Sequence, residues 1–130
     1  MDAQTPVYER ACAELRNGRK TGHWMWFTFP QLRGLGHSAM AHQYGIASLA
    51  EAEAYLKHPI LGPRLRECTT LVNAIEGSSI EQILGGIDAM KFRSSMTLFA
   101  AAAPSESIFR DALEKYFAGA PDPLTLQRIE

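Results

Sequence analysis

The sequence at residues 23–32 reads HWMWFTFPQL, and Gly34-Leu35-Gly36 follow after one further residue. This segment holds both tryptophans of the chain, two of its phenylalanines and a histidine. Aromatic side chains bury a large apolar area, and indole and imidazole groups need polar partners. We therefore expect the segment to fold inward as a turn or short helix that organises either the core or a ligand pocket.

On both sides of this segment, capping residues, prolines and glycines divide the chain into helices. Ser48, with Glu51 three residues later, forms a capping box, and the His58-Pro59 pair ends the helix that follows. No stretch alternates apolar and polar residues over a convincing length, so strands are not predicted. The expected helices cover residues 6–17, 38–47, 49–57, 80–84, 89–102 and 108–117, with one more from Pro59 or Pro63 to about residue 75 and a last turn at Asp122-Pro123. The pattern predicts an all-α fold, a single compact domain of about six to eight short helices over residues 1–130.

The composition is that of an ordinary globular domain, with 46% hydrophobic and 21% charged residues in a chain of 130. The formal net charge of −1 gives no general attraction to nucleic acid, so DNA or RNA binding is not expected. No apolar run is long enough to cross a bilayer, and the N-terminus lacks an apolar signal region. We therefore expect a cytoplasmic protein without a membrane partner.

The two cysteines, Cys12 and Cys68, lie far apart in the sequence and within predicted helices. In a chain without a secretory signal they are expected to be buried free thiols and not a disulfide. The four histidines, at positions 23, 37, 42 and 58, form no HxxxH or HxH arrangement. Neither a metal site nor a cofactor is expected.

Polar groups interleave with the aromatic side chains of residues 23–32. On an apolar wall, His23, the indole N–H of Trp26 and Gln31 would suit a small planar or anionic ligand. The competing interpretation is that the aromatic residues are simply core. The apolar stripes of the predicted helices, together with this segment, predict a core that includes Trp24, Phe27, Leu65, Cys68, Leu71, Val72, Met96 and Phe99.

A second candidate lies in residues 88–99, DAMKFRSSMTLF, where two cations and two hydroxyls interrupt an apolar helix. Arg93 has apolar neighbours on both sides, and three interpretations of its guanidinium are open. It reaches solvent, it pairs with an internal carboxylate, or it holds the phosphate or carboxylate of a ligand. Lys91 and Ser94 complete this set. Ser94 would be a nucleophile only with a histidine base delivered from elsewhere in the fold. Gly34-Leu35-Gly36 lacks the further residues of a phosphate loop, and a flexible turn is predicted there.

Three motifs, in one order, resemble a known family: HWMWFTFPQLRGLGHS, AEAYLKHPILGPRLREC and MKFRSSMTLFAAA. Together they resemble the bacterial family called domain of unknown function 1810, over roughly Thr5 to Leu126. The resemblance implies a small all-helical domain, and it implies no established activity, cofactor or catalytic residue. Members are sometimes labelled calpastatin, but the inhibitory repeats of calpastatin are disordered and rich in charge, whereas this chain has a globular composition and no repeats.

Two functions from different classes fit these observations. The first is a domain that binds a small anionic or nucleotide-like ligand in a cleft lined by Trp, His and Arg, with enzymatic activity left open. Its site would combine His23, Trp26, Gln31, Lys91, Arg93 and Ser94. The second is a protein-interaction or structural module with no ligand and no catalysis. Convergence of His23, Gln31 and Arg93 on one solvent-reachable cleft would favour the first function, and their separation the second.

Overall fold

The computed structural model describes residues 4–22, 24–31 and 45–129, with the backbone alone for residues 4–6, 26 and 27. Within these ranges no residue belongs to a β-strand, so the fold is all-α as predicted. No helix in the same ranges has the length and apolarity needed to cross a membrane. The helices are α1 (Gln4–Arg16), α2 (Met25–Thr28), α4 (Leu49–Lys57), α5 (Leu61–Ala74), α6 (Ile80–Leu84), α7 (Gly86–Ala102), α8 (Ser107–Phe117) and α9 (Pro123–Ile129).

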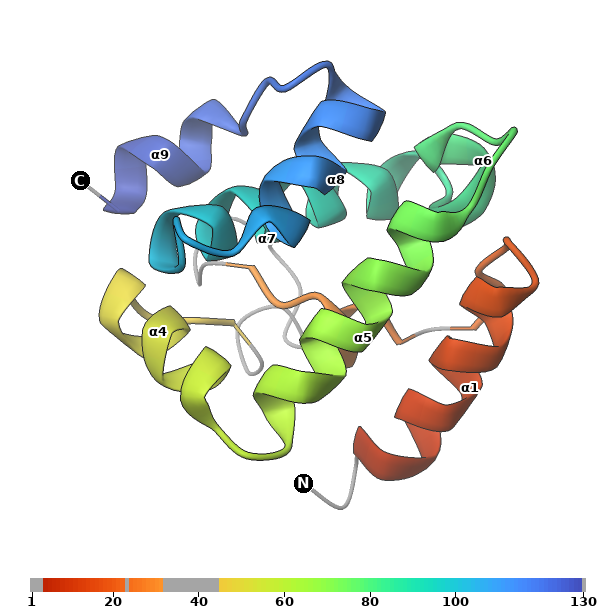
Figure 1. The fold of residues 1–130 in the computed structure, drawn as a ribbon, viewed down its shortest axis with the longest axis horizontal. Coiled ribbons are helices and arrows are strands. Elements are labelled where there is room, and N and C mark those ends of the chain that lie inside the picture. Colours follow the sequence, from red (N-terminus) through yellow and green to blue (C-terminus); the bar gives the residue numbers. More distant parts are fainter. Residues whose placement is uncertain (1–3, 23, 32–44, 130) are drawn as a thin grey trace.

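Helix α7 is the centre of the fold and packs against α4, α6, α8 and α9. Helix α5 packs against α1, α4 and α8, and Figure 1 shows α1 beside α5 on one side of the molecule with α9 on the other. Residues 94–99 of α7 are all buried, because neighbours surround the second half of this helix. A helix covered on every side has no polar face. The charged residues of α7, at positions 88, 91 and 93, accordingly lie in its first two turns.

Most of the predicted core is confirmed: Trp24, Leu65, Cys68, Val72, Met96 and Phe99 are all buried. Leu71 is only partly buried, because it lines a hollow between the C-terminal ends of α1 and α5. The side chain of Phe27 lies outside the described residues. Phe29 meets Phe92 of α7 edge to face, with 4.9 Å between ring centroids. The aromatic segment therefore packs directly on the central helix, and Trp24 and Phe29 are core.

The predicted capping box at Ser48 and the stop at His58-Pro59 place the start and the end of α4 correctly, and the predicted start of a helix at residue 80 is also correct. Ser48 Oγ accepts a hydrogen bond from the Glu51 backbone N–H at 3.1 Å, and α4 ends at Lys57, directly before the His-Pro pair. Helix α6 begins with a complete capping box, in which the side chains of Ser79 and Gln82 each accept from the backbone N–H of the other. Each cap supplies acceptors for N–H groups that a helix terminus otherwise leaves without partners.

Four helices begin at residues that differ from the prediction. Helix α1 starts at Gln4 and not at residue 6, and α5 starts at Leu61, between the two predicted prolines. Helix α7 starts at Gly86 and not at residue 89, because Gly85, at a φ of +88°, lets the chain leave α6 and enter α7 without a loop. Helix α8 starts at Ser107 and not at residue 108, with Glu106 as its N-cap. Ser105 lies within a turn that the Glu106 N–H closes by donating to the Ala103 carbonyl at 3.0 Å.

The helix predicted for residues 38–47 falls largely outside the described part of the chain, as does the turn at Gly34-Leu35-Gly36. Its last three residues, 45–47, are not helical. The backbone N–H of Ile46 donates to the Gln31 carbonyl at 2.8 Å, which ties this stretch to the end of the aromatic segment. A bond between such distant residues competes with the local bonds of a helix, so the predicted helix end at residue 47 was wrong.

Candidate functional site

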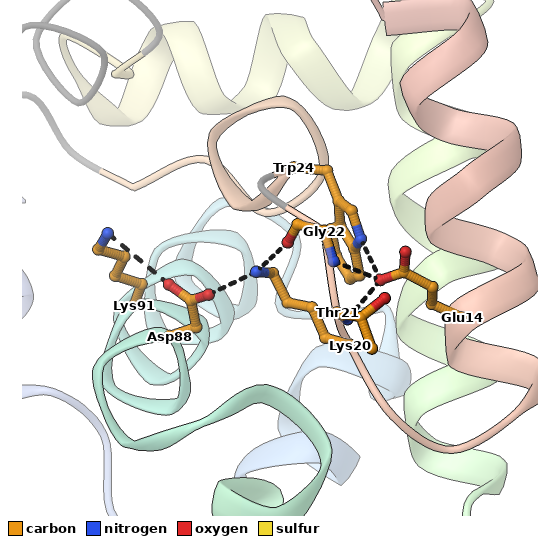
Figure 2. Close-up of polar contacts among 7 residues, drawn as sticks. All are labelled: Glu14, Lys20, Thr21, Gly22, Trp24, Asp88 and Lys91. Atoms are coloured by element: carbon orange, nitrogen blue, oxygen red, sulfur yellow. Dashed lines mark hydrogen bonds and ion pairs between the residues drawn. The ribbon is translucent and has the colours of Figure 1, made fainter.

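The connection between α1 and α2 is held by one carboxylate of α1. Glu14 Oε1 accepts hydrogen bonds from the backbone N–H of Thr21 at 2.6 Å, the backbone N–H of Gly22 at 2.9 Å and Trp24 Nε1 at 2.8 Å. Burial raises the pKa of Glu14, but the bonds from Gly22, Thr21 and Trp24 outweigh burial and lower it to about 2. The carboxylate therefore stays ionised at neutral pH and fixes the start of the aromatic segment (Figure 2).

Lys20 extends from the same connection toward the first turn of α7. Its Nζ lies 2.7 Å from Asp88 Oδ2 and donates to the Gly22 carbonyl at 2.5 Å. The ammonium also lies 5.2 Å from the centre of the Trp24 ring, within the range of a cation–π contact. Only 8% of the Lys20 side chain is exposed. A buried ammonium needs such partners, so Lys20 is fixed in place by groups from two parts of the fold.

A cavity of about 370 Å³ opens beside this ion pair. Figure 2 shows Lys20 and Lys91 reaching the Asp88 carboxylate from opposite sides, and Lys91 Nζ lies 3.7 Å from Asp88 Oδ1. Met25 brings the aromatic segment into the wall. The full lining consists of Lys20, Met25, Leu84, Gly85, Gly86, Ile87, Asp88 and Lys91.

The chemistry of this cavity favours a negatively charged group. Two ammonium groups face one carboxylate, which leaves a formal charge of +1 from Lys20, Lys91 and Asp88. Helix α7 begins at the cavity without a side-chain cap, and the first N–H groups of a helix carry partial positive charge. Gly86 has open space where a Cβ would lie, so its backbone is accessible. The arrangement can bind a carboxylate or a phosphate.

The predicted pair Lys91 and Arg93 does not meet at this cavity. Lys91 lines it, whereas Arg93 is not among the lining residues. Arg93 Nε and Nη2 donate to the backbone carbonyls of Ala120 and Pro121, each at 3.0 Å, and the guanidinium lies 5.8 Å from the Phe117 ring centre. Residues two apart on a helix point to different sides. Among the described residues, Arg93 is thus bound by the connection between α8 and α9 and by no carboxylate.

The other predicted site residues are placed only in part. His23 and the side chain of Trp26 lie outside the described residues. Gln31 is buried with 9% exposure, and it does not line the cavity. Ser94 is 7% exposed, and its Oγ donates to the Met90 carbonyl within the same helix at 3.2 Å. The sequence predicts that His23, Gln31 and Arg93 converge on one cleft. Of these three residues the structure describes Gln31 and Arg93, and neither lines the cavity that Lys91 lines.

Sequence reasoning missed Lys20 and Asp88 as site residues. The spacing of Asp88 and Lys91 is a usable signal, because residues three apart on a helix face each other. Nothing local in the sequence indicates that Lys20 reaches Asp88, since 68 positions separate them.

The rest of the described residues offers no metal site, and a second cavity there has no net charge. No group of three or more His, Cys, Asp or Glu side chains gathers there in a way that would hold a metal ion. A second hollow, of about 460 Å³, lies between the ends of α1 and α5. Arg16 and Glu76 both line this hollow, so their charges balance and neither sign of ligand is favoured.

Fold and site together define a small all-helical domain with a cationic cavity at the start of its central helix. The chain belongs to the family described as "Protein of unknown function (DUF1810)", whose members it matches over residues 1–129. It is similar to the conserved hypothetical protein Rv1873 from Mycobacterium tuberculosis, whose crystal structure it matches with a TM-score of 0.96 and 57% sequence identity. That match covers 98% of this chain and 91% of the mycobacterial one. No curated protein matches the chain.

Proposed function

We propose that the cavity at the start of α7 binds a small anionic metabolite through a carboxylate or phosphate group. The observation that carries the proposal is the convergence of Lys20 and Lys91 on Asp88 beside an open volume of about 370 Å³. Small-molecule sites usually occupy about 300–1,000 Å³, so the volume suits a metabolite and is small for a large cofactor.

The two lysines have different roles in this proposal. Lys20 is 8% exposed and is fixed by Asp88 and the Gly22 carbonyl, so it supplies a stationary positive charge. Lys91 is 24% exposed, and its contact with Asp88 is long, at 3.7 Å. Its ammonium, at the end of a flexible side chain, supplies a second positive charge for an incoming anion. Asp88 positions Lys20, and its own charge is offset by the two ammonium groups.

The apolar part of the cavity wall restricts the ligand further. Met25, Leu84 and Ile87 contribute hydrocarbon surface next to the charged groups. A ligand that satisfies both kinds of surface carries an acidic group on a short apolar or aromatic body. Phosphate monoesters and carboxylic acids of this kind are the expected class, and a free inorganic ion would use only the charged half of the cavity.

A thermal-shift screen tests the proposal with inorganic phosphate, simple carboxylic acids and nucleoside monophosphates as probes. A ligand at one hundred times its dissociation constant stabilises the folded chain by about 2.7 kcal/mol. Lys91→Gln should weaken the best probe by about tenfold, because it removes one charge-assisted hydrogen bond. Lys57→Gln is the matched control, because Lys57 lies at the exposed end of α4 and not at the cavity. Equal responses of wild type and Lys91→Gln to every probe would refute the proposed site.

The alternative function, a protein-interaction module, is supported by two exposed apolar residues next to the same cavity. Ile87 is 75% exposed and Met90 is 73% exposed, and they lie three residues apart on α7. Such side chains are typical of contact surfaces. The two functions are distinguished by Lys91→Gln and by replacement of Met90, which does not line the cavity, with serine. The anion site requires the first variant to lose the probe response and the second to retain it.

A further inference from the structure

The two cysteines of the chain face each other across the contact between α1 and α5. Cys12 Sγ and Cys68 Sγ lie 4.0 Å apart. Both are free thiols, with Cys12 3% exposed and Cys68 fully buried. The sequence predicts buried free thiols, and the structure confirms this while adding their close approach. Because 55 residues separate them in the sequence, only the packing of the two helices creates the pair.

A carboxylate and a phenol adjoin this thiol pair. Cys12 Sγ donates to Glu67 Oε1 at 3.4 Å, and the Tyr8 hydroxyl donates to the same oxygen in a short hydrogen bond. The Tyr8 bond, followed by the Cys12 bond, lowers the pKa of Glu67. Glu67 is exposed, so the cluster runs from solvent through the carboxylate to Cys12 and then to Cys68. This order places Cys12, and not Cys68, on the side of the pair nearer to solvent.

We propose that Cys12 and Cys68 are a reversible oxidation site, at which a hydroperoxide converts the two thiols into a disulfide that ties α1 to α5. A disulfide bond is about 2.05 Å long, so the sulfur atoms must approach by about 2 Å. The proposal requires side-chain rotation, with a small shift of α1 toward α5, to supply this movement. The site does not depend on the anion cavity, since none of its residues lines that cavity.

The reaction balances as two thiols and one hydrogen peroxide giving one disulfide and two water molecules. In the first step the Cys12 thiol gives up its proton, the sulfur attacks one peroxide oxygen, and the O–O bond breaks. The departing hydroxide takes up the proton and leaves as water, and Cys12 becomes a sulfenic acid. In the second step Cys68 sulfur attacks Cys12 sulfur, the S–O bond breaks, and the hydroxyl leaves as water with the Cys68 proton.

Burial makes this oxidation slow. It raises the pKa of the Cys12 thiol, to which the hydrogen bond with Glu67 adds, and it also raises the pKa of the Cys68 thiol. The thiolate is the reacting form, so only a small fraction of the molecules is reactive at any moment. Slow oxidation under peroxide and recovery with a reducing agent are the expected behaviour.

The test exposes the native wild-type protein to hydrogen peroxide, quenches it, and alkylates remaining thiols after denaturation. Since the chain has only two cysteines, mass spectrometry identifies any intramolecular disulfide as this one. We expect monomers that have lost two hydrogens, take up no alkylating reagent, and recover both reactive thiols with dithiothreitol. Two alkylated thiols per chain after prolonged exposure, or disulfide only between two chains, would overturn the proposal.

The role of Glu67 is tested by the rate of the same reaction. Glu67→Gln removes a negative charge that helps to raise the pKa of the Cys12 thiol, so more thiolate is present and disulfide formation should become faster by about threefold. Glu53→Gln, on the exposed side of α4, should react at the wild-type rate. Oxidation of Glu67→Gln at or below the wild-type rate would refute this role of the carboxylate, and a circular dichroism spectrum checks that both variants are folded.

Discussion

The clamp formed by Glu14 gives a stability prediction whose size follows from the structure. One carboxylate oxygen accepts bonds from two backbone N–H groups and from the Trp24 indole. Glu14→Gln keeps the shape of the side chain and one acceptor oxygen but removes the negative charge. Hydrogen bonds to a charged group are stronger than those between neutral groups, so each of the three bonds weakens.

The magnitude comes from the pKa of the carboxyl group. Its pKa falls from 4.5 to about 2 on folding, and each pKa unit corresponds to about 1.4 kcal/mol. The full difference would be about 3 kcal/mol at neutral pH. Because Glu14 is partly exposed, solvent screens part of this effect, and we expect a loss of about 2 kcal/mol for Glu14→Gln.

The pH dependence distinguishes a charge effect from a packing effect. Since folding lowers the pKa of Glu14, its stabilisation is fully present above about pH 4.5 and is lost as the pH falls toward 2. Urea unfolding at pH 7 and at pH 3 should therefore show a smaller difference between wild type and Glu14→Gln at pH 3. Glu9→Gln, at an exposed position of the same helix, should stay within about 0.5 kcal/mol of wild type at both pH values. A Glu14→Gln loss below about 0.5 kcal/mol at pH 7, or one that is unchanged at pH 3, would refute the reasoning.

Three further changes are tested by the same urea unfolding at pH 7. Phe99→Ala should cost about 3–5 kcal/mol because the ring is fully buried, and a loss under about 1 kcal/mol would contradict that burial. Arg93→Ala should cost about 1–2 kcal/mol, since the guanidinium bonds two carbonyls, and a loss of about 3–5 kcal/mol would indicate a buried carboxylate partner instead. Gly62→Ala should destabilise by about 2 kcal/mol or more, because the added Cβ would lie 2.2 Å from the Leu56 carbonyl oxygen. Alanine normally stabilises a helix relative to glycine, so a neutral or stabilising result would show that α4 and α5 can separate.

Local signals in the sequence were sufficient for most of the fold. Ser48 and Ser79 start helices because their side chains supply acceptors for the first free N–H groups, and a proline ends α4 because of its effect on the preceding residue. These effects act over three or four residues and can be recognised in a single sequence. The apolar stripes likewise predicted Val72 and Phe99 as core, since helical spacing decides which side chains share a face.

Contacts between distant segments could not be predicted in this way. The ion pair of Lys20 with Asp88 and the close approach at Gly62 both depend on how helices pack. Arg93 shows the same limit, because its sequence context indicated a half-buried cation but not the carbonyl groups that satisfy it. Of the described residues in the predicted site, Lys91 alone lines the cavity at the start of α7, and the binding of an anion there stays a prediction.

The most direct test of the anion site is a titration of the ¹⁵N-labelled protein with inorganic phosphate, followed by NMR. Phosphate bound at the cavity should shift the backbone amide signals of Gly85 to Asp88 in a saturable way, together with those of Lys20 and Lys91. Lys91→Gln should require about ten times more phosphate for the same shifts. Shifts that grow linearly without saturation, or that centre on Arg64 and Arg66 of α5, would contradict an anion site at the start of α7.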